Sequence, residues 1–377
     1  MRNIVVTYCM FTLFIYSCGR TADHVPNIID VDRFANNPQV HIINDIASNI
    51  DFIQLETVSE SLLRNVGKLQ IKDDKIFVLN GGGRHASLLV FDISGKFIRR
   101  IGSVGNGPGE YNAIVDFAVC DSLVLVLDPN LSKMILYNSF GKMVNETRIG
   151  TTPQGVSFLK GMPVLSYNYP FFARNDGFRI SVYDKNLNLF DKMLLSEKED
   201  KLTATGIFNF HTRSFFANVN DTLTFWETRD DAVYKIVDKN RIEKGYIFRY
   251  QNPADIEDGI HVLEAGKNEI IQMMEARKYI FFVGRFDGKP QLHRLIYFKE
   301  TGEVHKVRVN PKNRLLGFFP DMLIDDRTAC QLFSLYDYKA EMEKNNISPD
   351  NLDPKLQTLL KECKYDDNPC MMLVTLK

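Results

Sequence analysis

The sequence predicts an all-β protein, a six-bladed β-propeller, because three observations agree. Five segments resemble one another and follow each other at similar intervals along the chain. The clearest units each hold four short apolar strands, separated by turn residues. Three more strands near the C-terminus lack a fourth, which a strand at the N-terminus can supply. Four strands in about 45 residues are typical of a propeller blade, and pairing the two chain ends removes exposed sheet edges.

The repeat is clearest in the second half of each unit. Ser87–Phe97 has the pattern strand, turn, strand, and the same pattern returns in Lys133–Met143, Arg179–Leu189, Ala232–Ile242 and His293–Glu303. The aligned turn positions lie 46, 46, 53 and 62 residues apart, at Gly95, Gly141, Leu187, Asn240 and Gly302. Gly and Asn suit a hairpin residue with positive φ. We therefore expect a different turn at Leu187.

The sixth blade is expected to join the two ends of the chain. Its three C-terminal strands are predicted within 318–324, 328–333 and 370–376, and Asp51–Thr57 is the candidate for the fourth. The segment between the second and third of these strands predicts a small helical insert over 338–344 and 354–363. Pro354 then occupies the first helical turn, where proline is tolerated.

Composition and the first residues indicate where the protein is found. The chain has 377 residues, with 46 basic against 47 acidic side chains, so no basic excess favours nucleic-acid binding. Arg2 precedes an apolar run from Ile4 to Tyr16, and Ser17-Cys18 follows, which is typical of a secretory signal. This run is shorter than the roughly 20 residues that cross a bilayer.

Cys18 after a small residue resembles a bacterial lipobox, which implies lipidation of Cys18. The alternative is an ordinary signal peptide that is cleaved a few residues later. The predicted organisation is a lipoprotein signal peptide at 1–17, a polar tether at 18–44 and the propeller at 45–377. We expect a monomer in the cell envelope, held to the membrane only by its lipid, on the periplasmic or the outer-membrane surface.

Three further segments carry a family resemblance. Arg100–Tyr111, Phe52–Thr57 and Leu360–Pro369 resemble hallmarks of the bacterial six-bladed β-propeller lipoprotein family. The resemblance covers nearly the whole chain and implies a signal-anchored propeller, related in shape to NHL-repeat and TolB-like propellers. It brings little chemistry with it. The glycine-rich part, Gly105–Tyr111, lacks the Gly-Lys-Ser/Thr ending of a phosphate loop and opens a strand, so we expect a tight crossing between blades, with Glu110 capping N–H groups.

The mature cysteines show no zinc-ligand spacing. Cys120 and Cys330 lie in apolar strands and are expected to be buried and inert. Cys363 and Cys370 are close enough in sequence to form a disulfide, and the sequence leaves this open.

Arginines follow the second strand of four blades, and these loops are expected to surround one end of the central channel. Guanidinium groups there would suit carboxylate, sulfate or phosphate ligands, with aromatic side chains stacking on sugar or peptide groups. Pairing of these arginines with neighbouring acids is the alternative. The candidate ligand-binding residues are Arg84, Arg174, Arg229, Arg285, Tyr169 and Trp226.

Two functions of different classes follow. The first is a non-catalytic binding or scaffold module without a cofactor, which takes a glycan, a peptide or a protein partner at the channel mouth. The second is a hydrolase or lyase that depends on a divalent cation in the channel. Its candidate ligands are His85, Asp116 and His211, although the scattered histidines form no motif. The sequence favours the first.

Overall fold

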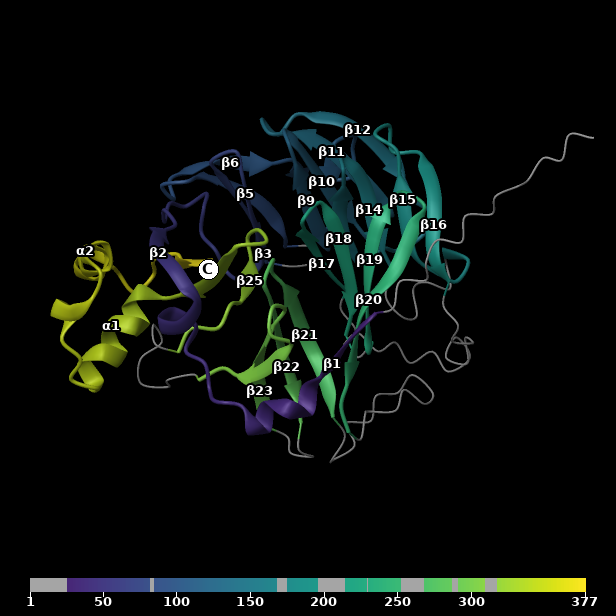
Figure 1. Ribbon diagram of the computed structural model, residues 1–377. Helices are drawn as coiled ribbons and strands as arrows, with labels where there is room; N and C mark the ends of the chain where they lie inside the picture. The colour runs from purple at the N-terminus through teal and green to yellow at the C-terminus, as the bar shows by residue number, and fades with distance from the viewer. Residues whose placement is uncertain are drawn as a thin grey trace, which may run out of the picture.

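Six blades, each with four antiparallel strands, surround a common axis in the computed structural model (Figure 1), and a short N-terminal strand adds a fifth, parallel strand to the sheet of blade four. The structure describes residues 26–81, 85–167, 175–195, 214–228, 230–251, 268–286, 291–308 and 317–377. Strands β3, β9, β17, β21 and β25 gather around the centre in Figure 1, and β6, β12 and β16 lie at the periphery. The predicted six-bladed propeller is therefore confirmed.

Each blade contributes its first strand to the centre and its fourth to the rim. Blade one consists of β3 (Val66–Lys72), β4 (Lys75–Asn80), β5 (Ser87–Asp92) and β6 (Phe97–Ile101). Blade two consists of β9 (Asp116–Cys120), β10 (Leu123–Asp128), β11 (Lys133–Asn138) and β12 (Met143–Arg148). Blade three consists of β13 (Gly155–Leu159), β14 (Met162–Ser166), β15 (Phe178–Tyr183) and β16 (Leu189–Leu195).

The remaining blades follow the same order. Blade four consists of β17 (Ser214–Val219), β18 (Thr222–Glu227), β19 (Ala232–Asp238) and β20 (Arg241–Arg249). Blade five consists of β21 (Glu269–Glu275), β22 (Tyr279–Arg285), β23 (Leu292–Phe298) and β24 (Glu303–Lys306). Blade six consists of β25 (Met322–Leu323), β26 (Thr328–Phe333), β27 (Cys370–Leu376) and, at its rim, β2 (Ala47–Gln54).

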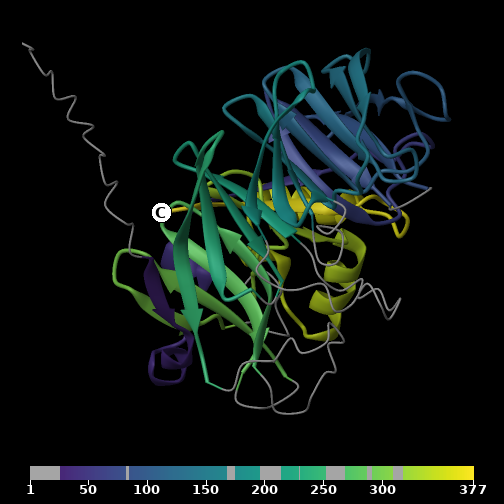
Figure 2. The same ribbon diagram turned by 90° about the vertical axis from the view of Figure 1, so that its right-hand side faces the viewer.

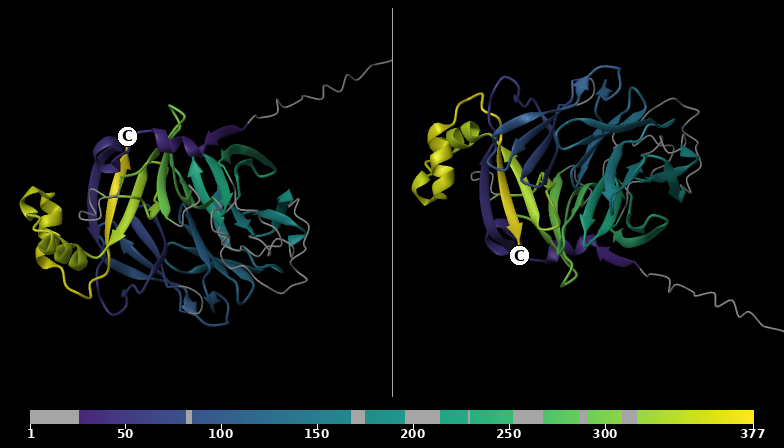
Figure 3. Two further views of the ribbon diagram at one scale, coloured as in Figure 1. Left: turned by 90° about the horizontal axis from the view of Figure 1, so that it is seen from below. Right: turned by 90° about the horizontal axis from the view of Figure 1, so that it is seen from above.

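The N-terminal strand closes the ring as predicted. β2 pairs antiparallel with β27, with Phe52 opposite Met372 and Gln54 opposite Cys370. The predicted helical insert is also confirmed. Between β26 and β27 lie α1 (Leu335–Lys344), a 3-10 turn (Pro349–Asn351) and α2 (Pro354–Glu362), which project from the side of blade six in both views of Figure 3.

Side chains of the insert hold it against the ring. Ser334 caps α1 by accepting a hydrogen bond from Asp337 N, and Asp353 caps α2 ahead of Pro354. Tyr338, Leu356 and Leu360 are buried in one cluster with Phe52 and Phe333. The insert is therefore part of the core of blade six.

Antiparallel strand order gives the ring two different faces. The inner strands begin on one face, which also holds the loops between second and third strands. We call this the mouth face. The opposite face, here called the hairpin face, holds the hairpins between third and fourth strands.

The chain between Asn27 and Asn36 differs from the prediction. Part of the expected tether at 18–44 is folded: β1 (Asn27–Asp30) runs parallel to β20, and a 3-10 helix (Val31–Asn36) follows it. Ile29, Val31 and Phe34 are buried, and Figure 2 shows this purple segment beside the green strands of blades four and five. These side chains pack against apolar residues of blades four and five, which is why the segment is ordered. A π-helical turn (Ile42–Ile46) leads into β2.

The turn at Leu187 also differs from the prediction, because it repeats the turns of blades one and two. Asp184 Oδ1 accepts hydrogen bonds from the N–H groups two and four residues later, as Asp92 and Asn138 do in theirs. Leu187 itself has a φ of 65°, against 92° at Gly95. Its side chain is buried between blades two and three, and this burial offsets the cost of the left-handed conformation. Gly141 and Gly302 have the predicted positive φ, whereas Asn240 does not.

Candidate functional site in the central channel

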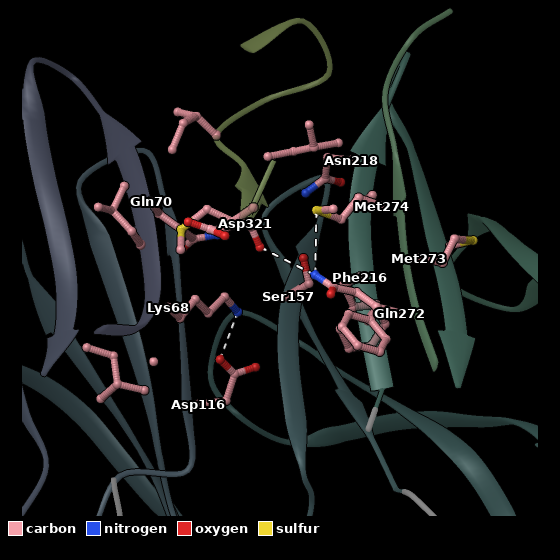
Figure 4. Close-up of a pocket in the computed structure, with 18 of the residues that line it drawn as sticks. Lys68, Gln70, Asp116, Ser157, Phe216, Asn218, Gln272, Met273, Met274 and Asp321 are labelled. Atoms are coloured by element: carbon pink, nitrogen blue, oxygen red, sulfur yellow. Dashed lines mark hydrogen bonds and ion pairs between the residues drawn. The ribbon is translucent and has the colours of Figure 1, made fainter. Parts of the chain in front are cut away.

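A cavity of about 640 Å³ lies on the axis of the ring. All six inner strands contribute to its wall, which Figure 4 shows from the side. Its volume falls in the range of small-molecule sites. The polar side chains that line it include Lys68, Asp116, Ser157, Asn218, Gln272 and Asp321.

Lys68 and Asp116 form the central charged pair of the wall. Lys68 Nζ lies 2.8 Å from Asp116 Oδ1, and the same oxygen accepts a hydrogen bond from Phe117 N at 2.8 Å. Asp116 Oδ2 accepts from Val156 N in blade three, also at 2.8 Å. Both carboxylate oxygens therefore have donors, and the pair joins the inner strands of three blades.

Uncharged polar groups make up much of the remaining wall. Gln70 Oε1 accepts a hydrogen bond from Val119 N at 2.8 Å. Gln272 Nε2 has two long contacts, 3.5 Å to Asp321 O and 4.0 Å to Met274 Sδ (Figure 4). The side chains of Asn218 and Ser157 have no hydrogen-bond partner within the described part of the chain. Their amide and hydroxyl groups can both donate to and accept from a ligand.

Apolar side chains line the same cavity. Phe215, Phe216, Met273 and Met274 lie along its wall, from blades four and five. Phe215 also stacks on Trp226, with ring centroids 5.4 Å apart. Methionine and aromatic side chains beside polar amides offer a ligand both apolar contact and hydrogen bonds.

A buried ionic cluster is centred on Glu275, one of the residues that line the cavity. The Glu275 carboxylate is almost fully buried and contacts both Lys235 and Lys299. Burial by itself raises the pKa of Glu275, but the two ammonium groups outweigh it and leave the pKa lowered. Burial lowers the pKa of Lys235. Thr224 donates to the same carboxylate, so the cluster fastens blade four to blade five.

The predicted arginine mouth receives no support from the part of the chain that the structure describes. Arg285 lies at the end of β22, where its guanidinium pairs with the carboxylate of Glu269. Arg84, Arg174, Arg229 and Tyr169 lie outside the described residues, as does Cys18. Arg285 therefore follows the alternative that the sequence left open, pairing with a neighbouring acid.

Trp226 is not at the mouth surface. It is fully buried, and its Nε1 donates a hydrogen bond to Asp230 O at 2.8 Å. Successive side chains of β18 point to opposite faces of the sheet, and Trp226 lies on the face that packs into the core between blades four and five. A stacking role toward a ligand is incompatible with this burial, and the ring supports Phe215 instead.

The suggested metal site receives no support from the residues that the structure describes. His85 is exposed in the turn before β5, and His211 lies outside the described residues. Asp116 is occupied by Lys68 and two backbone donors, as described above. Within the described ranges, no group of three or more His, Cys, Asp or Glu side chains could hold a metal ion.

The glycine-rich crossing is a closed structural unit, as predicted. Glu110 Oε2 accepts a hydrogen bond from Gly107 N, and Glu146 Oε2 accepts one from Gly109 N, both at 2.9 Å. Two short parallel strands, β7 (Ser103–Val104) and β8 (Glu110–Tyr111), hold its ends together. The N–H groups of Gly107 and Gly109 already donate to carboxylates, so they are not free to bind a phosphate.

All four cysteines of the described chain are free thiols. Cys330 is fully buried, as predicted, and burial raises its pKa. Cys120 is only half-buried. Cys363 and Cys370 do not form a disulfide in this structure, and burial raises the pKa of Cys370 to about 12.

Sequence reasoning missed the amides of the wall. Asn218 and Gln272 each interrupt an apolar inner strand with a polar residue. A polar residue within an apolar first strand could have indicated a channel-lining residue, because side chains of the first strand face the axis or a neighbouring blade.

Comparison with known proteins agrees with the fold. A predicted exported protein of Bacteroides fragilis superposes with a TM-score of 0.67 at 17% identity, covering 93% of this chain and 100% of that chain. A member of the DUF4221 family from Bacteroides vulgatus superposes with a TM-score of 0.52 at 11% identity, covering 88% and 98%. At these identities the likeness shows the fold alone.

No curated protein matches the chain. Among the described residues, no helix is both long and apolar enough to cross a membrane. A family model described as "Domain of unknown function (DUF4934)" matches residues 26–375, nearly the whole propeller. The chain therefore belongs to the DUF4934 family.

Proposed function

We propose that this protein is a lipid-anchored propeller of the cell envelope that binds an uncharged polar ligand, a segment of glycan or peptide, in its central channel without covalent chemistry. One observation carries the proposal. Each charged residue that is described in the cavity wall already has a partner in the protein, whereas Asn218 and Ser157 have none there. The wall is therefore suited to hydrogen-bonding a neutral ligand rather than to holding an ion.

The apolar side chains fit the same class of ligand. Glycans and peptides present apolar faces next to hydroxyl or amide groups, and Phe215 and Phe216 lie beside the amides of blades four and five. A carboxylate or phosphate ligand would instead need an unpaired cation. Lys68, the cation of the described wall, is held by Asp116.

The binding test compares channel variants with a matched surface variant. Short neutral oligosaccharides and uncharged peptides are screened by isothermal titration calorimetry against the wild-type protein. Asn218→Ala or Gln272→Ala should then weaken the best binder about fivefold to tenfold, the effect of one lost hydrogen bond. Asn186→Ala removes an exposed amide from the hairpin of blade three and should leave the affinity unchanged. Equal affinities of channel and surface variants would contradict the proposal.

The anchor rests on Cys18 and is tested separately. Cells that express the full chain are fed a fatty acid with a clickable tag. The wild-type protein should carry the tag, and Cys18→Ser should not. Tagging of Cys18→Ser, or no tagging of the wild type, would contradict lipidation at this residue.

A further inference from the structure

Apolar side chains are exposed at equivalent positions of three successive blades. Ile98 on β6, Val144 on β12 and Phe190 on β16 are 46 residues apart and are all exposed. Phe140, 72% exposed at the tip of its hairpin, and Leu189 add to this set. We call these five residues the hairpin band.

Contacts between blades make the band continuous. Arg99 donates to Phe140 O at 3.1 Å, and Asn145, its equivalent one blade later, donates to Asn186 O at 3.0 Å. Between blades three and four, Lys239 Nζ lies 4.5 Å from the ring centroid of Phe190. The fourth strands of blades one, two and three thus contact the hairpins of blades two, three and four, and Figure 1 shows β6, β12 and β16 in one arc.

The surroundings of the band are basic. The hairpins and outer strands of blades one to three, 92–101, 138–148 and 184–195, hold seven Lys or Arg against four Asp or Glu, in a chain whose net charge is −1. Glu146 is paired with Lys133, and Lys192 is paired with Asp176, each partner lying outside these ranges. Asp92 and Asp184 each accept hydrogen bonds from the backbone of their own turn. Arg99 and Lys239 lie over the rings of Phe140 and Phe190, so cations and apolar groups are presented together.

The direction of β1 relates the beginning of the described chain to the same face. β1 runs parallel to β20 with Asn27 opposite Tyr246, in the middle of that strand. β20 begins at the hairpin face and β1 runs parallel to it, so Asn27 is the end of β1 that is nearer to the hairpin face. Cys18 is nine residues before Asn27, and nine residues span at most about 30 Å.

We propose that the hairpin band docks on the anionic phospholipid surface to which Cys18 is attached, so that the mouth face points away from the membrane. The proposal rests on the lipid anchor described under "Proposed function". It adds a second membrane contact to the anchor, which the sequence analysis expected to be the only one. Exposed aromatic and aliphatic groups insert at the level of the headgroups, and lysine and arginine attract anionic lipids.

The test uses the single tryptophan of the chain. Trp226 is fully buried and gives a constant background. Phe140→Trp places a probe in the band, and Tyr365→Trp places a matched probe at an 80% exposed site before β27, on the mouth side. The full-length lipidated proteins are reconstituted into vesicles of phosphatidylethanolamine and phosphatidylglycerol that contain brominated chains. We expect loss of fluorescence and a blue shift for Phe140→Trp, and neither for Tyr365→Trp.

Further measurements distinguish failure of the docking proposal from failure of the lipid anchor. Flotation with the vesicles shows whether the anchor holds. A protein that does not float overturns both. A protein that floats with equal quenching at both positions overturns the docking alone. Shielding of Phe140→Trp from aqueous acrylamide without lipid quenching would assign the band to a protein partner and also overturn it. Lys142→Glu with Lys239→Glu, both at exposed sites, should reduce the quenching at position 140.

Discussion

Lys68 of blade one and Asp116 of blade two form an ion pair of 2.8 Å inside the channel, and Asp116 extends it to the backbone of blade three. The pair therefore joins segments 48 and 40 residues apart in sequence. A residue that was considered as a metal ligand acts here as a link between blades.

Asp116→Ala should destabilise the fold. The change leaves Lys68 and the N–H groups of Phe117 and Val156 without their acceptor, so we expect a loss of about 2 kcal/mol in the free energy of unfolding. Asp366→Ala is the control, because its side chain is exposed and its backbone does not have a positive φ, and it should change stability by less than about 0.5 kcal/mol. Urea unfolding measures both. Equal effects would show that the Asp116 contacts are not structural.

Glu275→Gln should lower the free energy of unfolding more than any other substitution of a charged residue discussed here. It leaves the buried ammonium groups of Lys235 and Lys299 without their carboxylate, at a cost of about 3–5 kcal/mol. Glu300→Gln, at an exposed site, should be close to neutral. Thermal melting at neutral pH compares the two variants, and a neutral Glu275→Gln would mean that the cluster does not fasten blade four to blade five.

The same cluster predicts a pH dependence. The pKa of Glu275 is lowered in the folded protein, so its contribution to stability is present above its unfolded pKa of about 4.3 and is lost as the pH falls through that value and below. The wild-type melting temperature should therefore fall below about pH 4.5. Glu275→Gln should show a shallower fall over this range, and parallel curves would argue against the assignment.

Gly95→Ala should destabilise the protein more than Gly302→Ala, although both positions have positive φ. A Cβ at Gly302 meets nothing within 4 Å, so only the left-handed backbone contributes, about 1 kcal/mol. A Cβ at Gly95 would overlap the carbonyl oxygen of Gln54 in β2. Gly95→Ala should therefore destabilise the protein by clearly more, because it also disturbs the closing strand. Equal melting temperatures would contradict this.

The thiols should react in order of their burial. Cys330 and Cys370 are fully buried and have raised pKa values, so iodoacetamide at neutral pH should not modify them in the native protein. The half-buried Cys120 and Cys363 should react slowly. Mass spectrometry of native and urea-unfolded samples gives the order, and early modification of Cys370 would show that blade six opens locally.

The sequence predicted the blades well because each blade is a local repeat. In blades one to three, hairpins with an Asp or Asn at their first position recur every 46 residues, and the apolar strands between them can be found without tertiary information. Closure by β2 was also predictable, since three strands need a fourth. β1 was missed because Asn27–Asp30 is short and its partner β20 is more than 200 residues away in the chain. The turn at Leu187 was not predicted because leucine disfavours positive φ, and the sequence does not show the burial of its side chain that offsets this preference.

The candidate site was harder to predict because it depends on contacts between blades. Counting the register of β21 and β22 from their turn would have placed Ile270 opposite Arg285, because a bulge between Ile270 and Gln272 brings Glu269 into that position. The alternation of β18 would have shown Trp226 facing the core. The bond from Asp116 to Val156 has no comparable signal, because it depends on how far each inner strand is shifted relative to its neighbour around the axis.

The pairing of β2 with β27 also sets the order in which the protein can be completed. β2 is made before every other strand of the six blades except the added strand β1, but its partner β27 is made last, at Cys370–Leu376. During synthesis five blades can form in succession while β2 has no partner. Contacts of such large sequence separation are slow to form, so closure of blade six is expected to be the last folding step. A nascent chain that stops just before Cys370 would keep both edges of blade six open, and it would be recognisable to chaperones and proteases as unfinished.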